Sequence, residues 1–162
     1  MIYYRPSIDL INNHLKKELD KTANVFKNKL MDASFSDVVG ELTGFDLIKT
    51  DLKCGGYCDI ENKEIAHVSG GINTILHEIS HVIQHKHELL EHKKKLSENL
   101  VIEQQAETMA KYLYMKIYDK TDVFDAYFTK DSILFLSDWY KDNCEQDIPK
   151  EVLAKFPNWE HF

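Results

Sequence analysis

The sequence lacks several features that mark particular protein classes. It has no apolar run near the roughly 18 residues that a membrane-spanning helix needs, and its first residues do not read as a secretory signal. The single arginine, Arg5, and the net charge of −7 remove the usual electrostatic basis for binding nucleic-acid phosphates. The three cysteines are an odd number, which favours a reducing compartment over a disulfide framework. We therefore expect a cytoplasmic protein that binds neither membranes nor nucleic acid.

The length and composition of the chain are typical of a folded domain. With 162 residues, of which 43% are hydrophobic and 29% charged, the chain is long enough to bury a core and too apolar to be disordered. No repeat or low-complexity tract divides it. We expect one domain over residues 1–162.

Apolar residues recur at helical spacing in several segments. Ser7 and Ser97 are each placed to cap the start of a helix. The expected helices cover residues 7–31, 72–89, 97–118 and 131–141, and residues 33–54 fit a short helix or strand with loops. Two strands, at about 57–60 and 63–68, flank a Glu61-Asn62 turn and predict a β-hairpin. The expected class is α+β, mostly helical, with a small antiparallel sheet before the helix that starts near Ile72.

That helix carries a motif with metal-binding spacing. In His77-Glu78-Ile79-Ser80-His81, the two histidines are one turn apart on one helix face, so both rings can reach one ion. Imidazole nitrogens suit tetrahedral Zn²⁺, and Glu78 is placed to act as general base on a water molecule. Two solvated histidines are the plainer interpretation, but apolar residues flank the motif, and a buried His-Glu-His group without a partner would be costly.

The next helix offers a third ligand. Glu103 and Glu107 are one turn apart, and the small residues Ala106 and Ala110 permit close helix approach. If the two helices pack antiparallel, Glu103 lies level with His81. We therefore expect Glu103 to bind zinc with His77 and His81, and Glu107 to hydrogen-bond a ligand histidine.

The two motifs together resemble those of the gluzincin metallopeptidases, in which H-E-x-x-H is followed by E-x-x-A-[D/N/E] on a second helix. The resemblance covers about residues 55–115 and is nearest to the ImmA/IrrE-type family and the zincin-like domain of ArdC-type antirestriction proteins. In both, a strand pair precedes the motif helix, and its start is similar to Gly56-Tyr57 in this sequence. It implies a zincin-like fold and hydrolysis of a peptide bond in a protein or peptide substrate. It also implies that the strand before the motif helix offers its backbone edge to the substrate. The residues expected there are Glu64, Ile65, Ala66, His67 and Val68.

Three functional questions stay open at this level. The residue that stabilises the transition state could be Tyr112, Tyr114, Tyr118, Tyr127 or His161. A metal-binding interaction or inhibitor protein, encoded by a phage or mobile element, is the alternative to an enzyme, although Glu78 would then have no role as a base. A purely structural zinc site is a third possibility, but the motifs supply no fourth side-chain ligand.

Overall fold

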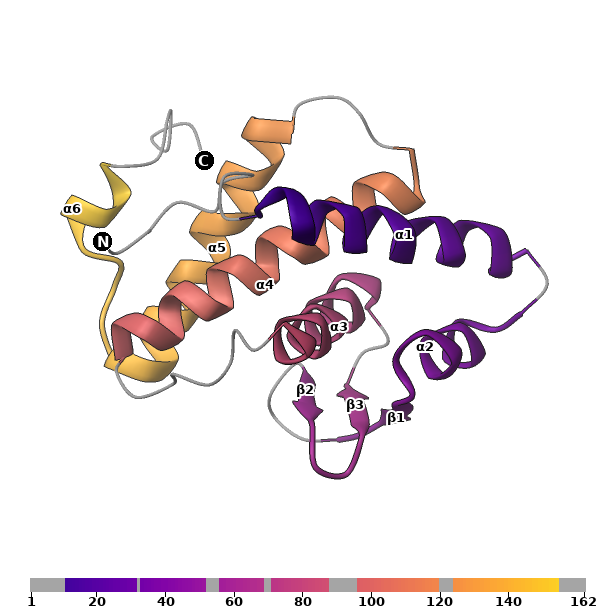
Figure 1. The fold of residues 1–162 in the computed structure, drawn as a ribbon. Coiled ribbons are helices and arrows are strands. Elements are labelled where there is room, and N and C mark those ends of the chain that lie inside the picture. Colours follow the sequence, from indigo (N-terminus) through magenta and orange to yellow (C-terminus); the bar gives the residue numbers. More distant parts are fainter. Residues whose placement is uncertain are drawn as a thin grey trace.

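A computed structural model of the chain describes residues 11–31, 33–51, 56–68, 71–87, 96–119 and 124–154, and within them it leaves out the side chains of 96–101, 124–132 and 135. The fold is α+β, as expected: it is mostly helical, with one small sheet before the helix that carries the motif (Figure 1). The elements in chain order are α1 (Asn13–Lys29), α2 (Phe35–Thr43), β1 (Asp46–Lys49), β2 (Gly56–Asp59), β3 (Glu64–His67), α3 (Ile72–Lys86), α4 (Leu96–Ile117), α5 (Phe124–Cys144) and α6 (Lys150–Leu153).

The first helix starts later than the sequence suggested. Its cap is Asn12, whose side-chain oxygen accepts a hydrogen bond from the Leu15 backbone N–H at 2.8 Å. Ser7 lies outside the described residues. Because Asn12 is the non-helical residue directly before α1, Asn12 and not Ser7 is the cap of this helix. Beyond the cap, α1 buries an apolar face that includes Leu19 and Phe26, as its helical spacing predicted.

The segment 33–51 contains both a helix and a strand. Ser34 caps α2 by accepting a hydrogen bond from the Asp37 N–H, and Gly44 ends the helix in the left-handed conformation at φ 72°. That conformation costs glycine little, because it has no Cβ. The chain then reverses into β1.

The sheet is mixed, which corrects the expected antiparallel sheet. The predicted hairpin is present, because β2 and β3 pair antiparallel. However, β1 pairs parallel with β3 on its other side, so the strand order is β1-β3-β2. The central strand is therefore β3, and β2 is an outer strand in the part of the chain that the structure describes.

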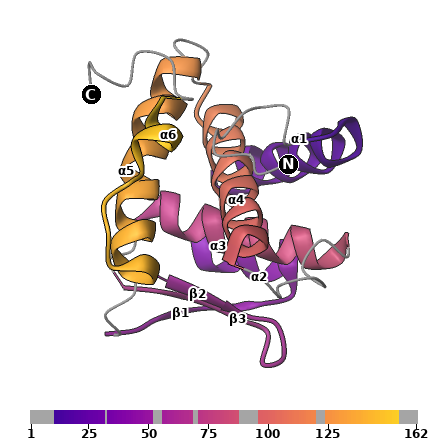
Figure 2. The same cartoon turned by 90° about the vertical axis from the view of Figure 1, so that its left-hand side faces the viewer.

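The motif helix α3 lies between this sheet and α4 (Figures 1 and 2). It packs on β2 and β3 on one side and on α4 on the other, while α1 also packs on α4. The main core is formed where these elements meet and includes Ile65, Leu76, Ile79 and Met109, all fully buried. As a result, α3 is held from two sides.

The later helices differ from the expected ones at their starts. Leu96 already belongs to α4, so Ser97 is not its cap. The helix expected at 131–141 is the longer α5, which begins at Phe124. Leu136, Tyr140 and Val152 form a second small core between α5 and α6. None of the described helices has the length and apolar content of a bilayer-spanning segment.

We predict opposite effects for two glycine-to-alanine changes. A Cβ on Gly56 would lie 2.6 Å from the Ala66 carbonyl oxygen of β3 and 2.8 Å from Thr74 Cγ2 of α3. Gly56→Ala therefore pushes β2 away from both elements and should lower the free energy of unfolding by about 1–3 kcal/mol. In the matched control, a Cβ on Gly40 meets only the Phe45 oxygen, at 3.8 Å. Gly40→Ala, within α2, should raise the free energy of unfolding by about 0.5–1 kcal/mol. Urea unfolding measures both, and equal effects would contradict the packing described for β2.

Candidate metal centre

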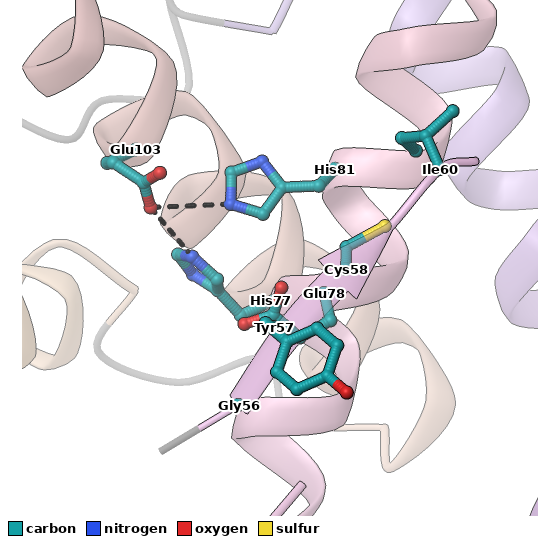
Figure 3. Close-up of a pocket in the computed structure, with 8 residues that line it drawn as sticks. All are labelled: Gly56, Tyr57, Cys58, Ile60, His77, Glu78, His81 and Glu103. Atoms are coloured by element: carbon teal, nitrogen blue, oxygen red, sulfur yellow. Dashed lines mark hydrogen bonds and ion pairs between the residues drawn. The ribbon is translucent and has the colours of Figure 1, made fainter. Parts of the chain in front are cut away.

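The two motif histidines lie together on the side of α3 that faces α4 (Figure 3). Their ring centroids are 4.8 Å apart, and the rings are nearly perpendicular. This follows from the helix, which places residues four apart on the same face, one turn away from each other. Both side chains are largely buried, with 13% of the His77 side chain and 10% of the His81 side chain exposed.

Glu103 on α4 reaches both histidines. Its Oε2 atom lies 3.0 Å from His77 Nε2 and 3.3 Å from His81 Nε2. One ligand atom from each of the three residues lies within 4.8 Å of the other two. The three side chains that the sequence singled out are thus brought together, and their nitrogen and oxygen atoms could hold a metal ion.

Glu107, one turn further along α4, contacts the other side of the His77 ring. Its Oε2 accepts a hydrogen bond from His77 Nδ1 at 2.9 Å, while its Oε1 lies 3.3 Å from Lys111 Nζ. Lys111 is itself 4% exposed. A buried carboxylate therefore sits between a histidine and a buried cation, which satisfies charges that would be costly alone.

These contacts shift the pKa values of the site. Burial by itself lowers the pKa of the His77 ring, but hydrogen bonds to Glu103 and Glu107, together with their charges, outweigh it and raise the pKa from 6.5 to about 10. Burial raises the pKa of Glu103, but hydrogen bonds and charges from His77 and His81 bring it below its ordinary value. The pKa of Glu107 is likewise lowered, against its burial, by His77 and then by Lys111. Both carboxylates therefore favour the protonated form of the His77 ring that lies between them.

Glu78 faces a cavity of about 310 Å³ together with the three candidate ligands (Figure 3). Glu78 as a whole residue is 7% exposed. The other residues that line this cavity come from β2 and the turn after it, and they are Gly56, Tyr57, Cys58 and Ile60. The candidate base and the candidate ligands thus share one opening.

The strand order corrects the expectation that the strand directly before α3 offers its backbone edge to a substrate. Strand β3 contains four of the five residues expected there: Glu64, Ile65, Ala66 and His67. Val68 follows the strand. Both sides of β3 are already paired, one with β1 and the other with β2. A strand with both neighbours in place has no backbone edge left for a substrate. The cavity is lined by β2, the outer strand of the hairpin, which the sequence pattern could not distinguish from its partner.

Of the tyrosines considered earlier, Tyr112, Tyr114 and Tyr118 do not line this cavity. Tyr112 donates a hydrogen bond to Asp20 Oδ1 at 2.7 Å, and the rings of Tyr114 and Tyr118 pack on each other. The side chain of Tyr127 and all of His161 lie outside the described residues. Among the described tyrosines, Tyr57 is the one at the cavity.

Sequence reasoning also missed Gln84, which lies three residues beyond His81 and is fully buried. Its Oε1 lies 2.8 Å from His81 Nδ1, and its Nε2 donates to the Ile102 carbonyl oxygen and to Gln105 Oε1, each at 2.9 Å. The one signal in the sequence was a polar residue at a position of α3 where the helical spacing of the apolar residues predicts burial.

We predict that His77 is an imidazolium ion in chelator-treated protein at pH 8. A pKa of about 10 leaves the ring almost fully protonated, whereas an ordinary histidine at pH 8 is about 3% protonated. Because the folded-state pKa is the higher one, this ion pair stabilises the metal-free fold fully below about pH 6.5, and its contribution is lost as the pH rises through about 10. Ring ¹⁵N NMR measures the titration, and Glu103→Gln should move it to lower pH. If the His77 ring of the unchanged protein is half-protonated near pH 6.5, its described contacts with Glu103 and Glu107 would be contradicted.

Comparison with known proteins gives a family match without an activity. Residues 64–122 match a family described as "Protein of unknown function (DUF3920)". The matched segment runs from β3 through α4 and so contains His77, Glu78, His81, Glu103 and Glu107. No curated protein and no solved structure matches the chain. The geometry of the site is therefore the basis for assigning a function to the chain.

Proposed function

We propose that this chain is a zinc-dependent metallopeptidase that hydrolyses a peptide bond in a protein or peptide substrate. The observation that carries the proposal is the convergence of His77, His81 and Glu103 within 4.8 Å, at a cavity that Glu78 also lines. The H-E-x-x-H and E-x-x-A-E motifs, which resemble those of gluzincins, are the residues that form this group. An open site with three protein ligands is the arrangement expected of catalytic rather than structural zinc.

The donor atoms fit zinc in kind, and the two separations from Glu103 Oε2 are close to those in a zinc site. Two imidazole nitrogens and one carboxylate oxygen form a common catalytic zinc set, with bonds of about 2.0–2.2 Å. Tetrahedral geometry then puts ligand atoms roughly 3.3–3.6 Å apart. The observed separations of Glu103 Oε2 from the two Nε2 atoms, 3.0 and 3.3 Å, need only small adjustment. Binding would replace the proton now held between His77 and Glu103.

The chain's own residues supply the proton transfers. Bound zinc contributes Lewis-acid activation of water and of the scissile carbonyl. Glu78 accepts a proton from the attacking water as the new bond forms between oxygen and the carbonyl carbon. It then passes that proton to the amide nitrogen as the C–N bond breaks, so that an acid and an amine leave and the carboxylate is regenerated.

The outer strand β2 is the element we propose for substrate binding. It lines the cavity, and within the described residues its far side has no strand beside it. An extended peptide can add to such an edge through backbone hydrogen bonds, which position a peptide bond with little dependence on sequence. Tyr57 is a candidate donor to the oxygen that becomes negative during the reaction.

We place the protein in the cytoplasm as part of this proposal. The support is the odd number of cysteines, which suits a reducing compartment.

Glu78→Gln separates a catalyst from a binding protein. The change keeps the size of the side chain and removes the base, so the variant should fold and bind one zinc per chain, while hydrolysis falls by roughly 10²–10⁴-fold. Zinc content and mass-spectrometric detection of new ends in a random peptide library measure the two properties. The matched control is Glu151→Gln, the same change at an exposed position on α6, which should leave both unchanged.

Two outcomes would overturn the proposal. Wild-type protein that folds but binds no zinc would remove the metal centre. Zinc binding with a biological effect that Glu78→Gln leaves intact would favour the alternative, a metal-binding protein that acts by contact.

A further inference from the structure

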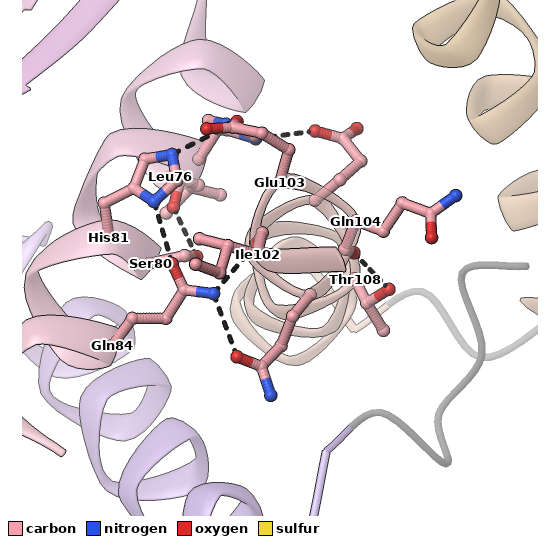
Figure 4. A network of polar contacts seen from close by, with 11 residues as sticks. Leu76, Ser80, His81, Gln84, Ile102, Glu103, Gln104 and Thr108 are labelled. Atoms are coloured by element: carbon pink, nitrogen blue, oxygen red, sulfur yellow. Dashed lines mark hydrogen bonds and ion pairs between the residues drawn. The ribbon is translucent and has the colours of Figure 1, made fainter. Parts of the chain in front are cut away.

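The buried amide of Gln84 links His81 to α4. Gln84 is fully buried on α3, and its three partners are His81 Nδ1, the Ile102 carbonyl oxygen and Gln105 Oε1 (Figure 4). Ile102 directly precedes Glu103 in α4. The amide therefore bridges one candidate ligand and the backbone beside another.

The orientation of this amide is fixed by its surroundings. A backbone carbonyl oxygen can only accept a hydrogen bond, so the group that faces Ile102 O must be the NH₂ group of Gln84. The amide oxygen must then face His81, where it lies 2.8 Å from Nδ1. Because an amide oxygen can only accept, Nδ1 must carry the proton of that hydrogen bond.

We propose that Gln84 is a positioning residue that selects the metal-binding nitrogen of His81. With the proton held on Nδ1, the lone pair of the neutral ring is on Nε2, the atom that lies 3.3 Å from Glu103 Oε2. Gln84 thus presents the correct tautomer and fixes the direction of the ring. This inference rests on the proposed metal site for its function, but the hydrogen bond itself belongs to the metal-free protein.

The two histidines are held by partners of different charge. Glu107 accepts from Nδ1 of His77, and Gln84 accepts from Nδ1 of His81. A carboxylate makes its histidine more basic, whereas an amide orients the ring without adding negative charge. Since the site already contains Glu78, Glu103 and Glu107, a neutral partner avoids a further buried anion near them.

The test compares two fully buried glutamines. Gln84→Met keeps the approximate volume of the side chain but removes the acceptor, and should weaken zinc binding by about 10–100-fold, measured by competition with a chromophoric chelator. Gln84→Glu restores an acceptor for Nδ1 and should bind zinc more tightly than Gln84→Met. The matched control is Gln104→Met on α4: Gln104 is also fully buried, but its amide has no partner among the described residues, and it points away from His81. Its zinc affinity should stay within about twofold of wild type.

Ring ¹⁵N NMR tests the tautomer without reference to activity. In wild-type protein, with or without zinc, His81 should show a protonated Nδ1, and in the zinc-loaded form a metal-bound Nε2. Zinc bound through Nδ1, or an unprotonated Nδ1, would overturn the inference even if Gln84→Met fails to fold. Wild-type affinity in a folded Gln84→Met variant would overturn it as well. If wild-type protein binds no zinc, the proposed function fails, and the Nδ1 proton of the metal-free form still decides the role of Gln84.

Discussion

The contact of His77 with Glu103 and Glu107 across the interface of α3 and α4 is the interaction on which the rest of the site depends. Two carboxylates and a histidine are buried in one small region, and such groups are stable there only when they are paired. Each helix supplies one part of the pair, so the polar contacts specify which faces meet. The apolar core around Leu76 and Met109 then supplies the burial that holds the helices together.

This arrangement leaves one side of the site open. The sheet supports α3 from below, and its outer strand β2 forms the wall of the cavity that contains Glu78 (Figure 3). Gly56 allows β2 to lie close to both β3 and α3, since a Cβ there would collide with the Ala66 carbonyl oxygen of β3 and with Thr74 Cγ2 of α3. The proposed chemistry therefore depends on a strand that must pack tightly against the motif helix while its other side stays unpaired within the described residues.

The sequence predicted the features that follow from local spacing and missed those set by tertiary pairing. His77 and His81, four residues apart on a helix, had to share a face. The carboxylates on the following helix could be placed on the assumption that the two helices pack antiparallel. The parallel pairing of β1 could not be foreseen, because its four residues have no distinctive pattern and the partner is chosen by the fold. For the same reason the hairpin was recognised, but not which of its strands faces the cavity. Gln84 was missed because its position among the apolar residues of α3 indicates burial but does not identify its three partners.

X-ray absorption at the zinc edge of the zinc-loaded protein tests the central claim most directly, because it reports the atoms bound to the metal. The account predicts two imidazole nitrogens, with oxygen as the remaining ligands, at about 2.0–2.2 Å, and no sulfur. A sulfur shell at about 2.3 Å would instead place a cysteine such as Cys58 on the metal. That result, or a spectrum with fewer than two imidazoles, would contradict a site formed by His77, His81 and Glu103.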